Sequence, residues 1–330
     1  MDQDPKVETS EHVLKQRALR IGQILRSVSR RRWVDYGFMA AFVLLLLIAA
    51  SVSDVFFTQR NISNLMRQTV TNGLISLGML VVILSGGIDL SVGSVVALSA
   101  ILASGMQHRL PLGLALLIAL GAGVLVGLLN GFLISRFRLA PFIVTLATLG
   151  AVRGTVYVYS EVPQVPSNPI FRSVLGGSLG PVPFSALVMA ICFVLVWFFL
   201  NRTTAGRAII AIGGNEEAAR LAGIRVSAHI LLSYAISGFF AATAGVLLAS
   251  RLGIAQPSVG AGYELDAIAA CVIGGAVLGG GSGGVVGTFG GVLTLGLIDN
   301  LLNLFNVQTY YQQIFKGLII LFAVLARRKE

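Results

Sequence analysis

The sequence predicts an all-α polytopic membrane protein, with about ten transmembrane helices in two glycine-rich, related halves. Of its 330 residues, 55% are hydrophobic and only 12% are charged, about half the charged fraction of a soluble domain. Its apolar residues form repeated runs of about the length of a membrane span. Its 39 glycines, in so apolar a chain, indicate closely packed membrane helices rather than flexible linkers.

The chain divides into a basic N-terminal segment, 1–35, and a transmembrane domain, 36–330. Apolar residues at helical spacing within 1–35 predict an amphipathic helix on the membrane surface, with a solvated tail as the alternative. The first apolar run follows too long a leader for a signal peptide, so we expect an uncleaved membrane helix. Ten candidate spans follow in order: 36–53, 68–84, 91–107, 111–132, 142–159, 182–201, 229–249, 264–279, 283–299 and 309–326.

The positions of the cations predict the orientation. Arginines and lysines gather before the first span, in two internal connections and at the last residues. This distribution obeys the positive-inside rule if both termini are cytoplasmic, in a bacterial inner membrane. The net charge of +10 then reflects membrane topology, and nucleic acid is not an expected partner.

Two glycine-rich junctions resemble each other. The pattern Gly-Gly, Leu, Gly-Ser recurs with the same spacing in both. Repeated halves with glycine-interrupted helices are typical of transporters, whereas chance similarity of glycine-rich turns is the alternative. The matching residues are Gly86, Gly87, Leu90, Gly93 and Ser94 in the first copy, and Gly274, Gly275, Leu278, Gly281 and Ser282 in the second.

The long connection 202–228 contains its own predicted helix. Asn215 is a suitable N-cap, and Glu216 and Glu217 place negative charge in the first turn, where the helix dipole favours it. Arg220 lies one turn later, at the spacing of an ion pair, and Gly223 can end the helix in a left-handed conformation. A short helix with a small-residue face suits docking into a groove on another protein. The alternative is a helix lying on the membrane.

These motifs carry a resemblance to a known family. The segment 206–224 resembles the coupling loop of bacterial ABC importer permeases of the ribose/xylose/galactose class, and 84–94 is similar to another signature of that family. Further matches are Asn130-Gly131, the run 141–146 and the glycines from Gly274 to Gly284. Two independent motifs in the expected order make the resemblance specific, and it extends from about residue 36 to the C-terminus.

The resemblance implies a permease subunit for inward transport of a monosaccharide, with ribose as the type. It also implies the partners: a separate cytoplasmic ATP-binding-cassette ATPase, a periplasmic sugar-binding protein and a second permease copy. The candidate ATPase-coupling residues are Gly206, Arg207, Asn215, Glu216, Glu217, Ala218, Ala219, Arg220 and Gly223. The chain contains no GxxxxGK[ST] loop, so it is not expected to be an enzyme, and ATP and Mg²⁺ would bind the partner.

A neutral sugar requires uncharged hydrogen-bonding groups among small residues. The candidate pathway residues are Asn72, Ser85, Asp89, Ser91, Ser94, Gly274 and Gly275. Asp89 has two compatible interpretations, a cap for the helix starting near Ser91 and a pathway carboxylate.

No metal site is predicted, because the three histidines and two cysteines are scattered. The outer loop 161–183 is a candidate contact for the binding protein, with an ordinary connection as the alternative.

Two other transport or chemical classes remain as rivals. A transporter driven by an ion gradient normally requires paired membrane carboxylates, and only Asp89 comes near that description. A membrane-embedded enzyme would require a cluster of catalytic side chains, which the sequence does not contain.

GxxxG spacings at 123/127/131 and 283/287/291 predict close helix packing, within the chain or between subunits.

Overall fold

The computed structural model describes residues 42–51, 53–308, 310–315, 317–318 and 321. The predictions for 1–35 and for half of the last apolar run, 309–326, lie outside these residues. The chain divides into two units, Met1–Leu47 and Ile48–Glu330. Within the described residues a short apolar helix, Phe42–Ser51, precedes the first long one.

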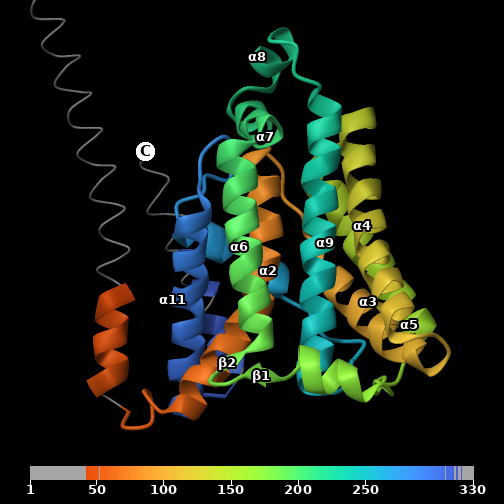
Figure 1. Ribbon diagram of the computed structural model, residues 1–330. Coiled ribbons are helices and arrows are strands. Elements are labelled where there is room, and N and C mark those ends of the chain that lie inside the picture. The colour runs from red at the N-terminus through yellow and green to blue at the C-terminus, as the bar shows by residue number, and fades with distance from the viewer. Residues whose placement is uncertain (1–41, 52, 309, 316, 319–320, 322–330) are drawn as a thin grey trace, which may run out of the picture. The chain divides into compact units, whose positions relative to one another are not determined.

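Helices make up most of the described chain (Figure 1). The α-helices are α2 (Gln59–Leu84), α3 (Val92–Gly105), α4 (Leu112–Phe137), α5 (Pro141–Tyr159), α6 (Phe184–Arg202), α7 (Thr204–Gly214), α8 (Glu216–Leu221), α9 (Val226–Leu252), α10 (Tyr263–Ile273) and α11 (Val285–Leu304). A 3₁₀ turn, Met106–His108, follows α3, and a π-helical turn, Phe171–Leu175, precedes a small antiparallel hairpin. That hairpin pairs β1 (Ser178–Leu179) with β2 (Val182–Pro183).

Six of these helices are long and apolar enough to cross a membrane: α2, α4, α5, α6, α9 and α11. The protein is therefore an all-α, multi-pass membrane protein. The predicted runs at 91–107 and 264–279 become α3, with 14 residues, and α10, with 11. At about 1.5 Å per residue neither spans a hydrocarbon core of about 30 Å. The predicted count of ten crossing helices is therefore not confirmed.

Local signals explain where the helices begin and end. α2 starts well before its apolar run because the Thr58 side chain accepts a hydrogen bond from the Asn61 amide. Pro141 occupies the first turn of α5, where its missing N–H costs nothing. Gly253, with φ of 66°, ends α9 in the left-handed conformation.

The first set of spaced glycines packs α4 directly against α9. A Cβ added at Gly123 would lie 2.6 Å from the Gly238 carbonyl oxygen, and one at Gly127 would overlap the Tyr234 carbonyl. Close backbone approach of this kind is what GxxxG spacing favours. The predicted packing role is confirmed, and the contact lies within the chain.

The second set packs α10 against α11. Cβ atoms at Gly287 and Gly291 would overlap the carbonyl oxygens of Gly274 and Ala270. Gly274 therefore serves a packing contact between a short helix and a long one. This contact also lies within the chain.

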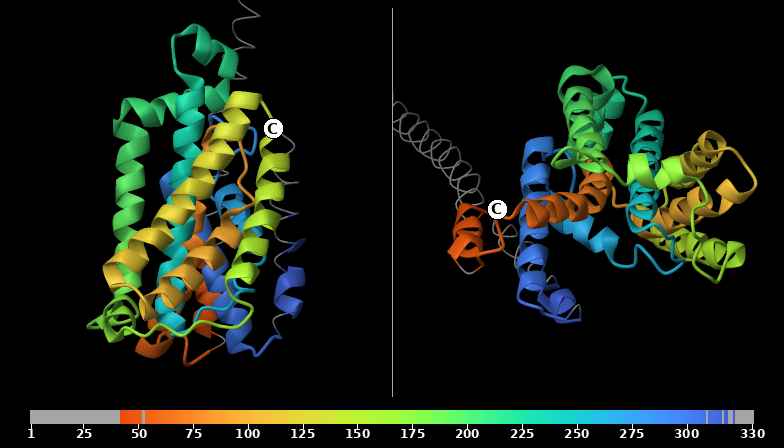
Figure 2. Two further views of the ribbon diagram at one scale, coloured as in Figure 1. Left: turned by 90° about the vertical axis from the view of Figure 1, so that its right-hand side faces the viewer. Right: turned by 60° about the horizontal axis from the view of Figure 1, so that its bottom comes forward.

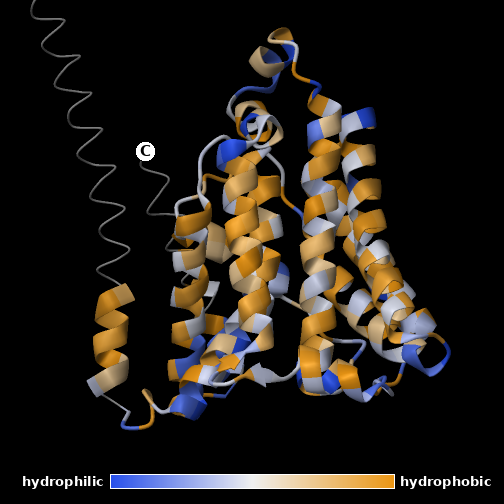
Figure 3. Cartoon of the chain, in the orientation of Figure 1, coloured by the Kyte–Doolittle hydropathy of each residue, from blue (hydrophilic) through white to orange (hydrophobic). Residues whose placement is uncertain are grey.

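The outer surface of the bundle is apolar. Large hydrophobic side chains remain exposed along three spans, for example Leu125 on α4, Val158 on α5 and Val194 on α6. Hydrophilic residues gather toward the two ends of the helices, and apolar ones fill the length between them (Figure 3). A soluble protein rarely exposes so much contiguous apolar surface, whereas lipid tails solvate it.

Candidate functional site

The connection between α6 and α9 stands at one end of the spans, and the β1–β2 hairpin lies at the other (Figures 1 and 2). We refer to these as the α8 end and the hairpin end. The connection contains two helices, α7 and α8, where the sequence predicted one. The Thr203 side chain caps α7 by accepting from the Gly206 amide at 3.0 Å. Gly206 is buried so closely against Phe199 and Leu200 that a side chain would collide with their backbone.

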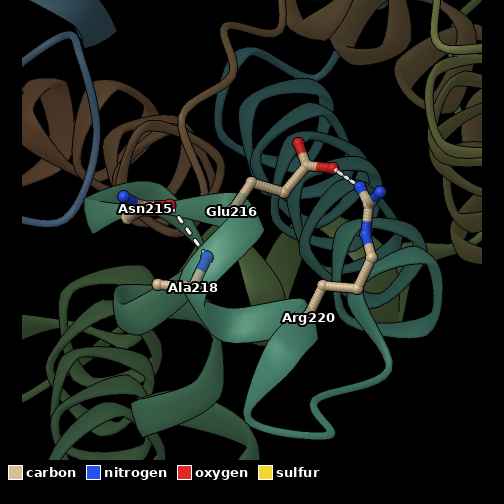
Figure 4. A network of polar contacts seen from close by, with 4 residues as sticks. All are labelled: Asn215, Glu216, Ala218 and Arg220. Atoms are coloured by element: carbon tan, nitrogen blue, oxygen red, sulfur yellow. Dashed lines mark hydrogen bonds and ion pairs between the residues drawn. The ribbon is translucent and has the colours of Figure 1, made fainter.

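Helix α8 has the predicted local structure. The Asn215 Oδ1 atom accepts a hydrogen bond from the Ala218 amide at 2.9 Å, and Arg220 forms an ion pair with Glu216 (Figure 4). Gly223 follows the helix with φ of 81°. The predicted cap, ion pair and left-handed stop are all confirmed. Glu217 and Arg207 are exposed, so both side chains are accessible from solution.

The alanines of α8 do not share one face. Ala219 packs with Ile212 and Val226 in a small buried cluster, which anchors α8 to the neighbouring helices. Ala218 and Ala222 face solvent instead. Beside them Leu221, which the sequence analysis did not single out, is 85% exposed. A large apolar side chain held this far out of the fold favours contact with another surface.

Asp89 lies in the first glycine-rich junction, between α2 and α3, and is 1% exposed. Its carboxylate accepts three hydrogen bonds, from the Ser91 amide at 3.0 Å, the Ser91 hydroxyl at 2.6 Å and the Ser237 hydroxyl at 2.8 Å. Ser91 is the N-cap of α3, and Asp89 holds the turn that precedes it.

This carboxylate belongs to a longer polar network. Asn130 on α4 donates to the Ser91 hydroxyl at 2.9 Å, and its side-chain oxygen accepts from Thr148 on α5 at 2.7 Å. The Ser94 hydroxyl donates to the Ser91 carbonyl. Three candidate pathway residues, Asp89, Ser91 and Ser94, are thus brought together. The sequence analysis named Asn130 only as part of the family match Asn130-Gly131 and missed Thr148 and Ser237, whose only signal was a polar side chain inside an apolar run.

The other candidate pathway residues lie elsewhere. The Asn72 side chain donates to Asp266 on α10 at 3.5 Å. Ser85 lines a cavity at the α8 end. Gly274 packs against α11, as described above, and Gly275 adopts a left-handed φ of 102° in the turn that ends α10. The structure therefore brings together some of the candidates and leaves the rest apart.

A further cation, Arg153 in the middle of α5, was also missed. Its guanidinium donates to the carbonyl oxygens of Pro257 and Val259, each at 2.7 Å, and to that of Gly93 at 3.4 Å. It thereby ties the loop before α10 to the start of α3. A lone arginine inside an apolar run was the available signal, because such a residue needs partners within the protein.

The two glycine-rich junctions and α7 meet at one place, which we call the glycine contact and define as Gly86, Gly213, Gly280 and Gly281. The Gly281 amide donates to the Leu84 carbonyl at 3.1 Å. A Cβ at Gly213 would overlap that carbonyl, and one at Gly280 would lie 2.8 Å from the Gly86 Cα. The connection that carries α8 therefore touches both junctions through backbone alone.

Comparison with known proteins agrees with this architecture. Residues 61–324 match the family described as branched-chain amino acid transport system / permease component. The chain belongs to this family of permease components.

Curated relatives extend over nearly the whole chain. The ribose import permease protein RbsC of Bacillus subtilis (strain 168) is 43% identical over 297 residues, covering 89% of this chain and 92% of the relative. RbsC of Escherichia coli (strain K12) is 39% identical over 319 residues, covering 92% and 99%. The L-arabinose transport system permease protein AraH of Escherichia coli (strain K12) is 37% identical over 303 residues, covering 90% and 92%. No solved structure matches the chain.

Proposed function

We propose that the chain is the permease subunit of an ATP-binding-cassette importer that moves a ribose-type monosaccharide inward. The observation that carries this proposal is identity of about 40% to ribose import permeases over about nine-tenths of the chain. The chain forms the path by alternating access. Like the permeases it resembles, it does no chemistry itself, and ATP and Mg²⁺ bind a separate ATPase.

The geometry of the α7–α8 connection supports coupling to that ATPase. Helix α8 is capped by Asn215, stabilised by the Glu216–Arg220 ion pair and anchored through Ala219. A force applied to α8 can therefore move the neighbouring helices without unfolding α8. Its exposed face offers Leu221 as an apolar anchor and Glu217 as a charge. The glycine contact places α7 against both junctions, which gives the motion of α8 a direct route to the ends of α2 and α10.

The proposed assembly contains two copies of the chain, an ATPase on the α8 side and a sugar-binding protein on the hairpin side. Both termini and α8 lie on the cytoplasmic side of a bacterial inner membrane. The ten proposed membrane segments form two related halves, and α3 and α10, which are too short to cross as helices alone, count among them as interrupted segments. The Gln164–Ala255 bridge and the buried Phe171 hold the 161–183 loop in a defined shape. A loop with a defined shape is suited to serve as a docking surface for the binding protein.

Reconstitution into liposomes tests the proposal. The chain is combined with its ATPase and binding protein, and uptake of labelled ribose is measured with and without ATP. We expect uptake to require ATP and to survive ionophores that collapse ion gradients. Uptake that follows the ion gradient would instead establish the rival secondary transporter.

A charge reversal in α8 tests the coupling assignment. Glu217→Arg should lower ATP-driven uptake at least about tenfold if α8 docks on the ATPase, because rim charges steer and orient such contacts. Asp54→Arg reverses an exposed charge far along the chain from α8 and should transport normally. Equal activity of both variants would remove α8 from the coupling role.

A branched-chain amino acid is a second candidate substrate, favoured by the description of the matched family. Competition separates the two. Excess unlabelled ribose should abolish uptake of labelled ribose, and excess L-leucine should leave it unchanged. Uptake of labelled leucine by the same complex would make the amino acid the substrate.

A further inference from the structure

A cavity of about 950 Å³ opens at the α8 end. Its walls come from the α4–α5 turn, α8, the first turn of α9 and the first glycine-rich junction. Four arginines line it: Arg136, Arg138, Arg220 and Arg225. Such a concentration of cations in one concave surface focuses a positive potential.

Three of these arginines are uncompensated. Arg220 is engaged by Glu216, which also lines the cavity. The side chains of Arg136, Arg138 and Arg225 form no hydrogen bond or ion pair with any residue that the structure describes. These three arginines are exposed, so water and salt weaken their mutual repulsion. An anion bound between them in the cavity would still gain from all three charges.

The backbone adds to this potential. Two long helices begin at the cavity, α5 at Pro141 and α9 at Val226, and neither has a side-chain cap. Pro141, Ser227 and Ala228 all contribute to the lining. The positive ends of both helix dipoles therefore face the same space as the three guanidinium groups.

An apolar surface adjoins the charged one. Leu139 lines the cavity, and Phe142 and Ile143 on the next turn are largely exposed. The cavity lies where α4 and α5 meet, at the ends of two candidate membrane spans, so we expect these side chains at the boundary between headgroups and tails. A free phosphate ion would use only the charged part of this arrangement, whereas a phospholipid would use both.

We propose that this cavity binds the phosphate of an anionic phospholipid headgroup, with the acyl chains lying along the apolar surface of the α4–α5 turn. Basic pockets between membrane helices are known to select anionic headgroups. A lipid bound in the cavity would stabilise the position of α8, because Glu216 and Arg220 of α8 form part of the cavity wall.

The test uses the full chain purified in detergent. Thermal unfolding and lipid retention in native mass spectrometry are measured with phosphatidylglycerol, with phosphatidylcholine and with inorganic phosphate. We expect phosphatidylglycerol to bind at least about tenfold more tightly than phosphatidylcholine. In Arg136→Gln/Arg138→Gln/Arg225→Gln this preference should disappear.

A matched variant, Arg60→Gln/Arg109→Gln/Arg202→Gln, loses the same charge at exposed positions outside the cavity and should keep the preference. If the cavity triple variant fails to fold, the three single substitutions replace it, and each should weaken the preference. An unchanged preference without the cavity arginines would overturn the proposal. Inorganic phosphate stabilising the chain as well as phosphatidylglycerol does would also overturn it, in favour of a soluble anion.

Discussion

Asp89 shows how hydrogen bonds keep a carboxylate inside the bundle, since no cation among the described residues forms an ion pair with it. Its three hydrogen bonds, two from Ser91 and one from Ser237, replace the solvation it loses. Hydrogen bonds to an ionised acceptor are roughly twice as strong as neutral ones. The network fixes the turn between α2 and α3, so Asp89 shapes the junction whether or not substrate contacts it.

Replacing Asp89 by asparagine tests this reading. The amide NH₂ would take the place of an accepting oxygen and face a serine hydroxyl that now lacks its acceptor. We expect Asp89→Asn to lower the free energy of unfolding by about 1–3 kcal/mol, measured by thermal unfolding in detergent. Asp54→Asn, at an exposed position, should change nothing. Equal stability of the two variants would show that the network contributes little.

Arg153 belongs to the same scale and follows the same rule. Its charge is balanced by carbonyl oxygens of Pro257, Val259 and Gly93 rather than by a neighbouring carboxylate alone. Polar groups at membrane depth need partners within the protein. Ser237, which donates to Asp89, and the three carbonyl partners of Arg153 are distant in sequence, so only the folded chain reveals those contacts.

At the scale of elements, two pairs of helices pack backbone against backbone: α4 with α9, and α10 with α11. α4 and α9 approach so closely at Gly127 that a Cβ would overlap the Tyr234 carbonyl. Association of membrane helices depends on such packing, because lipid tails are as apolar as the helices. The glycines therefore bring helix backbones into contact, beside a core of large apolar side chains such as Leu74 and Leu77.

A pair of substitutions on α4 tests the contact. Gly127→Ala should destabilise the protein by about 1–3 kcal/mol, because the helices must move apart. Gly121→Ala on the same helix has no atom within 4 Å of the new Cβ, and it should be neutral or slightly stabilising through helix propensity. Thermal unfolding in detergent measures both. The prediction is wrong if the two alanines have the same effect.

Helix α8 provides a second prediction at this scale. Asn215→Ala removes the N-cap and should cost about 1 kcal/mol of helix stability. We expect weaker binding of the ATPase and slower ATP-driven uptake, with the bundle itself still folded. Asn215→Asp keeps a capping oxygen and should restore both. A loss of uptake in the aspartate variant as severe as in the alanine variant would mean that the cap is not the cause.

At the scale of the whole molecule, three segments that are distant in sequence meet at the glycine contact. α7 reaches the end of α2 through Gly213, and the loop between α10 and α11 reaches the same carbonyl through Gly281. If the α7–α8 connection moves during transport, as proposed, these contacts predict that a junction moves with it. The glycine backbones are in direct contact, so no gap remains that could close before the junction itself moves.

Two adjacent glycines allow a matched test. A Cβ at Gly213 would collide with the Leu84 carbonyl, whereas one at Gly214 would meet nothing within 4 Å. We expect Gly213→Ala to slow ATP-driven uptake several-fold while binding of the ATPase remains unchanged, because the contact beyond α8 is disturbed. Gly214→Ala should transport normally. If both variants transport alike, the glycine contact does not transmit the motion.

The sequence by itself determined the membrane class, the main spans, the α8 cap with its ion pair, and the family resemblance. Each of these rests on composition or on residues within a few positions of one another. The tertiary structure decided that α3 and α10 are too short to cross a membrane, that the spaced glycines pack α4 on α9 and α10 on α11, and that Asp89 joins a buried network. Those features depend on contacts between distant segments. Hydrophobic runs and turn residues do not specify such contacts, because only packing in three dimensions determines which backbones approach and which polar groups find partners.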